Sequence, residues 1–239
     1  MRILIIQHDT SGHAGRFRRL FTAHGIRVTA IIAPKTTEWP ALDSFDALWV
    51  MGGAMQLWET EAHPWLTSEI AFIKQCVLAA GKPYFGVCFG HQLLAVACGG
   101  QVGAAQTREF GLLSIKGGDA VLGGDGTDHR EVFQWHSAEV NAMPPGFHSG
   151  WRSPDCAHQT MQGPNGVHSV QFHPEVDVAT LQDWYAVPGV IDDLVAIGGA
   201  SLPDRLLADF KERTGQQEVM AEELFGNWLR GAKLRLGER

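Results

Sequence analysis

The chain has 239 residues, of which 45% are hydrophobic and 19% charged, and its formal net charge is −7. A chain of this length and composition can bury a sizeable core in one large domain or two small ones. Its 19 Lys and Arg residues are spread along the chain, which excludes the clustered positive charge that nucleic-acid phosphates require. We therefore expect the ligand to be a small polar metabolite.

The N-terminus and the cysteines indicate the cellular compartment. The first apolar run ends at Gln7, too early for a signal-peptide core, and no later run approaches the ~18 apolar residues of a membrane span. The four cysteines contain no C-x-x-C pair, which argues against a disulfide framework and against a thiolate zinc site. We predict a cytoplasmic protein without cofactor or metal, which binds neither nucleic acid nor membrane.

The first hundred residues alternate between strand-like and helix-like segments. Near-continuous apolar runs predict strands at 2–7, 27–32, 46–53 and 83–87. Helical patterns lie between or after them, at 14–25, 64–80 and 90–98. This order predicts an α/β fold with a doubly wound, mostly parallel sheet and helices on both faces. In such sheets the ligand binds at the carboxyl ends of the strands.

The rest of the chain changes character twice. Residues 101–172 predict shorter strands, some antiparallel, joined by loops at "KGGDAVLGGDGTD" and "MPPG", as an extension of the same domain. From Val178 the pattern is helical, with segments near 178–186, 188–197, 203–213 and 217–235. Gly215 is predicted to end the helix at 203–213. We expect a main domain over 1–178 and a helical extension over 179–239 that packs on it.

The stretch "GVCFG" places Cys88 between two glycines where a strand passes directly into a helix. This spacing matches the G-x-S-x-G elbow, in which a tight turn exposes a nucleophile, with cysteine in place of serine. The positive end of the following helix would favour the thiolate, and the free N–H of Phe89 could hold an oxyanion. The alternative is a small buried cysteine in an ordinary strand-to-helix turn.

A thiolate that attacks an acyl carbon needs a general acid and base, usually an oriented histidine. The stretch "SVQFHPEVD" supplies such a group, because His173 ends an alternating strand and Glu175 follows two residues later. The alternative is a solvated strand end in which neither side chain has a partner.

Together, "GVCFGHQLLA" and "QFHPE", with "MGGA" upstream, closely resemble motifs of the class I glutamine amidotransferase family. These are its nucleophile elbow, its histidine-glutamate motif and its oxyanion-strand glycines, and their order and spacing also match. "EAHPWLTSEIAFIKQCVLAAGKP" and "FQWHSAEV" further resemble a stand-alone branch that is similar to the amidotransferase domain of GMP synthase. The resemblance covers about residues 1–178 and implies a flavodoxin-like sheet.

The resemblance implies hydrolysis of the side-chain amide of glutamine through a γ-glutamyl thioester. Cys88 would be the nucleophile, His173 the general acid and base, and Glu175 the residue that orients the imidazole. The N–H groups of Gly53 and Phe89 would form the oxyanion hole. The positions that match substrate-contacting positions of the family are Gly52, Gln92, Trp135, His136 and Ser137.

Three positions depart from the family pattern. Ala54 replaces a proline after the paired glycines, which would leave that loop less stiff. Ala138 stands where the family often has the aspartate of a Gly-Asp pair, and Glu139 is near enough in sequence to replace that carboxylate. Leu112 stands where the related branch often has tryptophan, which changes one wall of the expected pocket.

Several functions remain open at this point. The leading one is a glutamine amidohydrolase that releases ammonia or passes it to a separate synthetase subunit. A second enzyme reading is hydrolysis of another γ-glutamyl peptide or amide by the same triad. A third, of another class, is a binding or regulatory protein that keeps the fold without chemistry. The helical extension could pack on the main domain, form a homodimer contact or dock a partner. The loop that holds His8, Asp9 and His13 reads as a polar segment beside the site.

Overall fold

A mostly parallel sheet forms the centre of the protein, which we describe from a computed structural model over residues 1–237. Its six strands lie in the order β2-β1-β3-β4-β9-β8, and all neighbours are parallel except the edge strand β8. The bounds of these strands are Arg2–Gln7 (β1), Arg27–Ile32 (β2), Ala47–Val50 (β3), Tyr84–Val87 (β4), Thr160–Gly163 (β8) and Val167–Val170 (β9). The predicted strands at 2–7 and 27–32 are confirmed to the residue.

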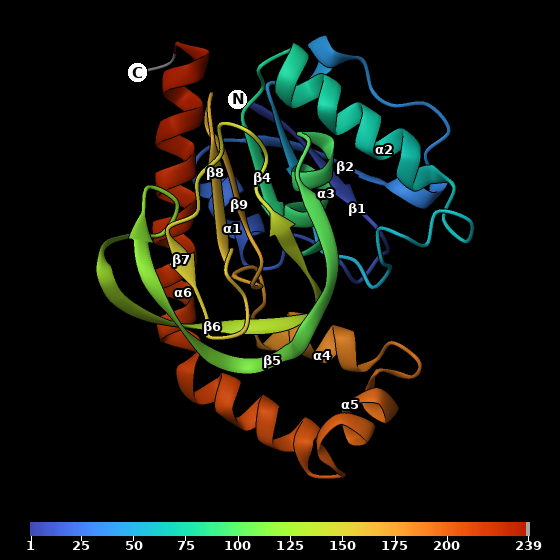
Figure 1. The fold of residues 1–239 in the computed structure, drawn as a ribbon, viewed down its shortest axis with the longest axis vertical. Helices are drawn as coiled ribbons and strands as arrows, with labels where there is room; N and C mark the ends of the chain where they lie inside the picture. The colour runs from blue at the N-terminus through green and yellow to red at the C-terminus, as the bar shows by residue number, and fades with distance from the viewer. Residues whose placement is uncertain (238–239) are drawn as a thin grey trace.

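Helices cover both faces of this sheet, as predicted (Figure 1). The six α-helices are Phe17–Ala23 (α1), Trp65–Lys74 (α2), Phe89–Ala97 (α3), Val178–Tyr185 (α4), Val190–Gly198 (α5) and Leu202–Leu236 (α6). Alternate residues of β3 separate two cores: Trp49 packs with residues of α1 and α6, whereas Leu48 packs with residues of α2 and α3. Both faces of the strand are buried, which explains its continuous apolar sequence.

A long antiparallel hairpin forms a second sheet, in the order β6-β5-β7. Its strands are Gln101–Asp119 (β5), Gly123–Ala142 (β6) and Trp151–Arg152 (β7). The predicted short strands and the "KGGDAVLGGDGTD" loop are wrong here, because this stretch continues the hairpin through a tight turn. Asp119 accepts hydrogen bonds from the N–H groups of Val121 and Leu122 in that turn, at 2.9 and 3.1 Å. Gly117 has φ of 158°, and a Cβ there would lie 1.9 Å from the carbonyl oxygen of Gly150, so close strand packing requires the glycine.

The C-terminal segment ends in one helix of 35 residues, where the sequence predicted two. Gly215 lies inside α6 and does not stop it. Packing on both sides of this glycine holds the helix together: Phe210 and Met220 are buried, and the Gln217 amide donates to the carbonyl of Glu131 at 2.8 Å. Figure 1 shows α6 running along the full height of the molecule. It contacts α1, β5, β6 and β9. The domain boundary that the sequence places at residue 178 stays a prediction.

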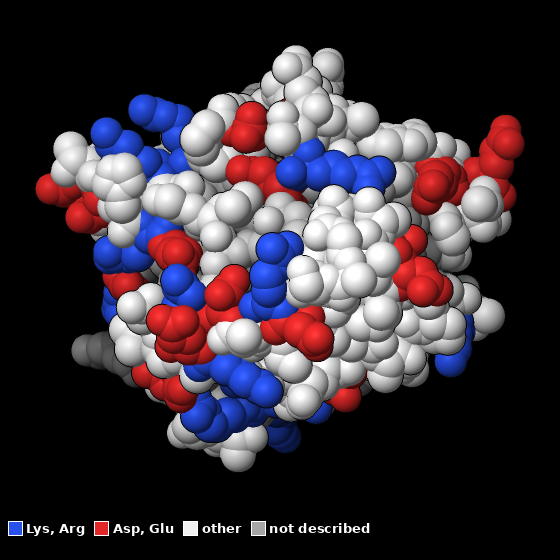
Figure 2. All heavy atoms as spheres, turned by 90° about the horizontal axis from the view of Figure 1, so that it is seen from below, with Lys and Arg blue, Asp and Glu red and all other residues white. Residues whose placement is uncertain are grey.

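Charges of both signs are interleaved on the surface. On the face shown in Figure 2, basic and acidic side chains alternate, and no patch of one sign dominates. The Arg19 guanidinium, for example, pairs with Glu218 of α6. Within residues 1–237, every helix is either too short or too polar to cross a lipid bilayer.

Candidate active site

Cys88 lies in a strained turn between β4 and α3. It is the N-cap residue of α3, its φ is 51°, and it is 6% exposed. A positive φ is unfavourable for a residue with a Cβ, and such strain is typical of functional turns. Gly90 makes the turn sterically possible, because a Cβ there would lie only 2.1 Å from the carbonyl oxygen of Val50. The hydroxyl of Tyr84 donates to the Gly90 carbonyl at 2.8 Å and holds the first turn of the helix.

The carboxyl ends of three neighbouring strands bring the predicted residues together. Gly52 follows β3, Cys88 follows β4 and His173 follows β9, and these strands are adjacent in the sheet. A Cβ on Gly52 would lie 3.1 Å from Cε1 of His173 and 3.8 Å from Cβ of Cys88. The glycine therefore lies beside both reactive side chains, and any larger residue would crowd the imidazole.

His173 and Glu175 form a buried pair. Nδ1 of His173 lies 2.7 Å from Oε1 of Glu175, and the two side chains are 5% and 2% exposed. Burial disfavours the charged imidazole, yet the Glu175 carboxylate and the nearby Cys88 raise the pKa of His173 well above its ordinary value. The main-chain N–H of His173 donates to the carbonyl of Phe133 at 2.8 Å, and the Trp184 ring lies edge-on at 5.1 Å. Both contacts orient the imidazole.

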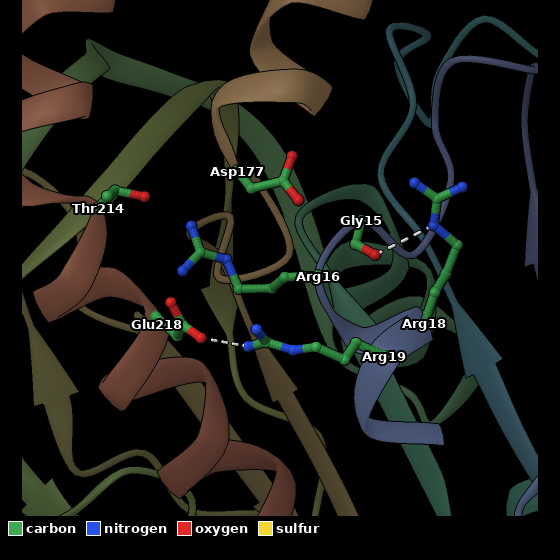
Figure 3. A pocket seen from close by; sticks show the side chains of 7 residues that line it. All are labelled: Gly15, Arg16, Arg18, Arg19, Asp177, Thr214 and Glu218. Carbon is green, nitrogen blue, oxygen red and sulfur yellow. Dashed lines mark hydrogen bonds and ion pairs between the residues drawn. The ribbon is translucent and has the colours of Figure 1, made fainter. Parts of the chain in front are cut away.

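The N-terminal loop fixes the segment that follows His173. The N–H of Arg16 donates to the Glu175 carbonyl at 2.9 Å, and its guanidinium donates to the Val176 carbonyl from Nε at 3.1 Å. Figure 3 shows this guanidinium at the wall of a cavity of about 290 Å³. The cavity is lined by residues of α1, α6 and the loops between, namely Gly15, Arg16, Arg18, Arg19, Asp177, Thr214 and Glu218. The positive charges of its three arginines are largely balanced by the negative charges of its two acidic residues.

The two predicted oxyanion donors come from the start of α3 and from the loop that follows β3. Phe89 is the first residue of α3, so its N–H has no acceptor within the helix. The Gly53 N–H and the Gly52 carbonyl belong to the same peptide group. That carbonyl accepts a hydrogen bond from Nδ1 of His8 at 2.8 Å. His8 in turn lies 3.1 Å from Oε1 of Glu69 through Nε2.

The predicted substrate-contacting residues Gln92, Trp135 and Ser137 come from α3 and β6, close to Cys88. The Gln92 amide is buried and donates to the Ala138 carbonyl at 3.0 Å. The Cys88 sulfur lies 3.9 Å from the Trp135 carbonyl oxygen and 3.6 Å from the amide nitrogen of Gln171. Ser137 accepts a hydrogen bond from the Gln56 amide at 3.3 Å. The main chain from 135 to 138 therefore approaches the nucleophile and its helix.

The His136 side chain belongs to a separate buried network. Its Nε2 lies 2.9 Å from Oε2 of Glu109, and its Nδ1 lies 3.1 Å from the Ala138 carbonyl oxygen. The Gln159 amide also donates to Glu109, at 2.6 Å. Cys156 lies close enough for the three groups to resemble a metal site. Both imidazole nitrogens already lie within hydrogen-bond distance of oxygen atoms of the protein, so hydrogen bonds alone account for the placement of this ring.

The position of Glu139 does not support the idea that it replaces the missing family aspartate. Glu139 lines a cavity of about 490 Å³ together with Gln106, Arg152, Ser153, Pro154, Asp155 and Ala157. Neither Cys88 nor His173 contributes to that wall. Glu139 follows Ala138 directly in β6, and neighbouring residues of a strand point to opposite faces, so the two side chains lie on different sides of the strand.

The three cysteines outside the Cys88 turn are buried free thiols. Burial raises the pKa of Cys76 to about 12, that of Cys98 to about 11 and that of Cys156 to about 12. These thiols are therefore poor nucleophiles at neutral pH.

Sequence reasoning placed His8 in a polar loop beside the site, because it follows β1 by one residue, but gave its side chain no role. It missed two further residues, Glu69, which pairs with His8, and Trp184, which packs on His173. Glu69 shares the apolar face of α2 with Leu66 and Phe72, and a carboxylate in such a position signals a buried partner. Trp184 comes from a distant helix and carries no comparable local signal.

Comparison with known proteins agrees with the predicted family. The family model described as glutamine amidotransferase class-I matches residues 18–185. A GMP synthase from Thermomicrobium roseum is 29% identical over 212 residues, which cover 85% of this chain and 37% of that protein. The chain spans about a third of the length of the curated relatives that it matches.

Solved structures show the same fold over nearly the whole chain. A glutamine amidotransferase from Thermotoga maritima is 22% identical with a TM-score of 0.83, and the match covers 98% of each chain. One from Methylobacillus flagellatus is 25% identical with a TM-score of 0.82, and it covers 96% of this chain and 94% of that one. Both matches extend through the C-terminal helices.

Proposed function

The chain belongs to the class I glutamine amidotransferase family, and on that premise we propose that it is a cysteine-dependent amidohydrolase whose substrate is glutamine. Cys88, His173 and Glu175 form its catalytic triad, and the N–H groups of Gly53 and Phe89 form its oxyanion hole. Gly52, Gln92 and the main chain from 135 to 137 contact the bound substrate.

In the first half-reaction, the Cys88 thiolate attacks the side-chain amide carbon of glutamine. The C=O electron pair moves onto oxygen, and the Gly53 and Phe89 N–H groups stabilise the resulting oxyanion. Collapse of this tetrahedral intermediate breaks the C–N bond, while the His173 imidazolium gives its proton to the leaving nitrogen. The products are ammonia and a γ-glutamyl thioester on Cys88.

In the second half-reaction, His173 removes a proton from water, which attacks the thioester carbon. The second oxyanion occupies the same two donors. Its collapse expels the Cys88 thiolate and yields glutamate. Glu175 keeps Nδ1 of His173 protonated, so that Nε2 is the nitrogen that exchanges protons with substrate and water.

The observation that carries this proposal is the position of Gly52 beside both Cys88 and His173. Three strand ends converge there, the histidine is already paired with a carboxylate at 2.7 Å, and the nucleophile occupies the N-terminus of a helix. A binding protein on the same fold would gain nothing from a strained cysteine and a buried imidazole-carboxylate pair, since both cost stability.

We further propose that the ammonia is released or passed to a separate synthetase subunit. The matched part of this chain makes up only 30% and 37% of two relatives named GMP synthase, so their remaining length could hold the amide-accepting chemistry. A pull-down with the intact chain, followed by measurement of glutamine-dependent amination in the recovered complex, tests this part separately from hydrolysis.

Ammonia release from glutamine by the pure protein is the direct test of the enzyme proposal. Wild-type protein should release ammonia and glutamate in equal amounts, and Cys88→Ala should abolish both. Cys98→Ala is the matched control, because Cys98 is a buried thiol at the other end of the same helix. Release that survives Cys88→Ala would overturn the mechanism. Turnover of other γ-glutamyl amides or peptides but not of glutamine would instead favour the γ-glutamyl hydrolase.

A further inference from the structure

His8 occupies a buried position against the proposed oxyanion loop. It is 3% exposed and lies at the carboxyl end of β1, next to β3 in the sheet. Its Nδ1 lies 2.8 Å from the Gly52 carbonyl oxygen and its Nε2 lies 3.1 Å from Oε1 of Glu69. Both partners are acceptors, so an imidazolium that donates from both nitrogens satisfies the arrangement. Burial alone would lower the pKa of His8, but the Glu69 carboxylate raises it above its ordinary value.

The hydrogen bond to the Gly52 carbonyl also determines where the Gly53 N–H points. The two groups belong to one planar trans peptide, in which C=O and N–H point in opposite directions. Glycines offer little resistance to rotation of that peptide, and Ala54 lacks the ring with which a proline would stiffen the loop. His8 holds the carbonyl on its own side and thereby turns the N–H away, where it is free to meet a ligand.

Among residues 1–237, Glu69 has no side-chain hydrogen-bond partner other than His8. It lies within α2, its side chain is fully buried, and its Oε2 has no hydrogen-bond partner. A buried carboxylate with a single partner is costly, and the cost is offset only if the paired cation is held firmly. A hydrophobic residue at this position would pack with Leu66 and Phe72 and leave α2 intact. Pairing with His8, and not the stability of α2, therefore accounts for the carboxylate.

The His8 ring also packs against the second proposed oxyanion donor. Its centroid lies 4.9 Å from that of Phe89, edge to face, and 5.7 Å from that of Trp65 on the other side. A Cβ on Gly53 would lie 3.1 Å from Cγ of His8. The imidazolium is thus in contact with the residues that carry both N–H donors, and it is enclosed by rings that keep water away.

We propose that His8 and Glu69 are a positioning pair that holds the Gly52–Gly53 peptide with its N–H directed at the oxyanion of the reaction. The pair does not touch substrate or exchange protons with it. The inference rests on the proposed function, because it assigns these residues to the oxyanion hole of the same amidohydrolase.

Kinetics of three variants test the pair. His8→Phe keeps the ring and removes both hydrogen bonds, and it should lower kcat by roughly 10- to 100-fold, since one oxyanion donor is worth about 10²-fold or more. KM for glutamine should change by less than about threefold, because the oxyanion forms only after binding. Glu69→Gln retains an acceptor for Nε2 but removes the charge that favours the imidazolium, so kcat should fall by less than in His8→Phe. His63 is half-buried and also contacts Trp65, so His63→Phe serves as the control.

Alkylation of Cys88 separates positioning from a general loss of structure. Iodoacetamide alkylates the thiolate by displacement of iodide, a reaction that forms no oxyanion. His8→Phe should therefore be alkylated at the wild-type rate although its kcat has fallen. An equal fall in alkylation rate and kcat would indicate collapse of the Cys88 turn and would overturn the assignment.

A double variant covers the case in which His8→Phe leaves Glu69 buried without a partner and fails to fold. His8→Phe/Glu69→Leu removes both charges and should show the same loss of kcat as the single variant, because the two residues act as one unit. Wild-type kcat in either variant would refute the positioning role. Absence of glutamine turnover in the wild-type protein would instead refute the proposed function, so the two failures are distinguishable.

Discussion

The turn that holds Cys88 and the wall that faces it are built in different ways. Consecutive residues form the turn, and main-chain atoms set its geometry: Gly90 lies against the carbonyl of Val50, and Cys88 has a positive φ. The wall is assembled from side chains of distant segments, in which Trp135 of β6 packs edge-on against Phe110 of β5 and against Trp184 of α4.

This difference separates reactivity from recognition. Main-chain packing leaves no room for an extra atom, so the geometry of the nucleophile should respond to substitution in an all-or-none way. Side-chain packing adjusts by rotamer changes and small shifts, so the wall should respond gradually. Changes to the turn should therefore abolish turnover, and changes to the wall should alter affinity for substrate.

Gly90→Ala gives the largest expected effect. The added Cβ would lie 2.1 Å from the Val50 carbonyl oxygen, and both atoms belong to rigid elements. We expect a loss of roughly 3 kcal/mol or more in the free energy of unfolding, together with loss of activity. Urea unfolding measures the first and ammonia release the second. Gly226→Ala is the control, because only the flexible end of Arg230 lies near it. A stable, active Gly90→Ala protein would contradict main-chain control of the turn.

The same contrast explains what the sequence could predict. The elbow and "FHPE" are short stretches in which the spacing itself carries the geometry, so Cys88, His173 and Glu175 could be named as a set before the structure. The bounds of β1 at 2–7 were equally accessible, because a buried parallel strand is a continuous apolar run. The bounds of β2 at 27–32 were also predicted, although this edge strand is mostly exposed, because its sequence is rich in β-branched residues.

Features that depend on long-range packing were not predictable in this way. Glycines at 117 and 118 suggest a loop, whereas close packing against Gly150 makes them part of a strand. His8 and Glu69 are 61 residues apart, and only the fold shows that they meet. A local pattern cannot reveal a contact whose two halves lie on different elements.

Glu175→Gln tests the triad and gives the second-largest expected effect. The carboxylate raises the pKa of His173, whereas burial lowers it. Replacing the carboxylate by an amide leaves only the nearby Cys88 to oppose burial, so the pKa of His173 should fall and the basic limb of the kcat profile should move to lower pH. We also expect kcat at its optimum to fall on the order of 10²-fold or more, as when other triads lose their orienting carboxylate. A pH–rate profile of both proteins measures this, and an unshifted basic limb would exclude Glu175 as the orienting group.

Trp184→Ala tests the wall. The indole packs on His173 at 5.1 Å and on Trp135 at 5.5 Å, and it donates to the Ser11 carbonyl at 3.1 Å. Its loss opens the wall but leaves the Cys88 turn intact, so KM should rise by roughly 10-fold with a smaller change in kcat. Trp184→Phe should recover most of the affinity. If kcat alone fell, the indole would act on His173 rather than on the wall.

Gly215→Ala gives the smallest expected effect and tests the element on which sequence and structure differ most. Gly215 is exposed in the interior of α6, and no atom lies within 4 Å of the position of an added Cβ. Alanine favours the helix over glycine by about 1 kcal/mol, so the free energy of unfolding should rise by roughly 0.5–1 kcal/mol without a change in ammonia release. Urea unfolding resolves a shift of this size. A helix that stopped at Gly215, as the sequence suggested, would place the glycine in a terminal conformation, and alanine would then destabilise the protein. The sign of the change therefore distinguishes one continuous helix from two.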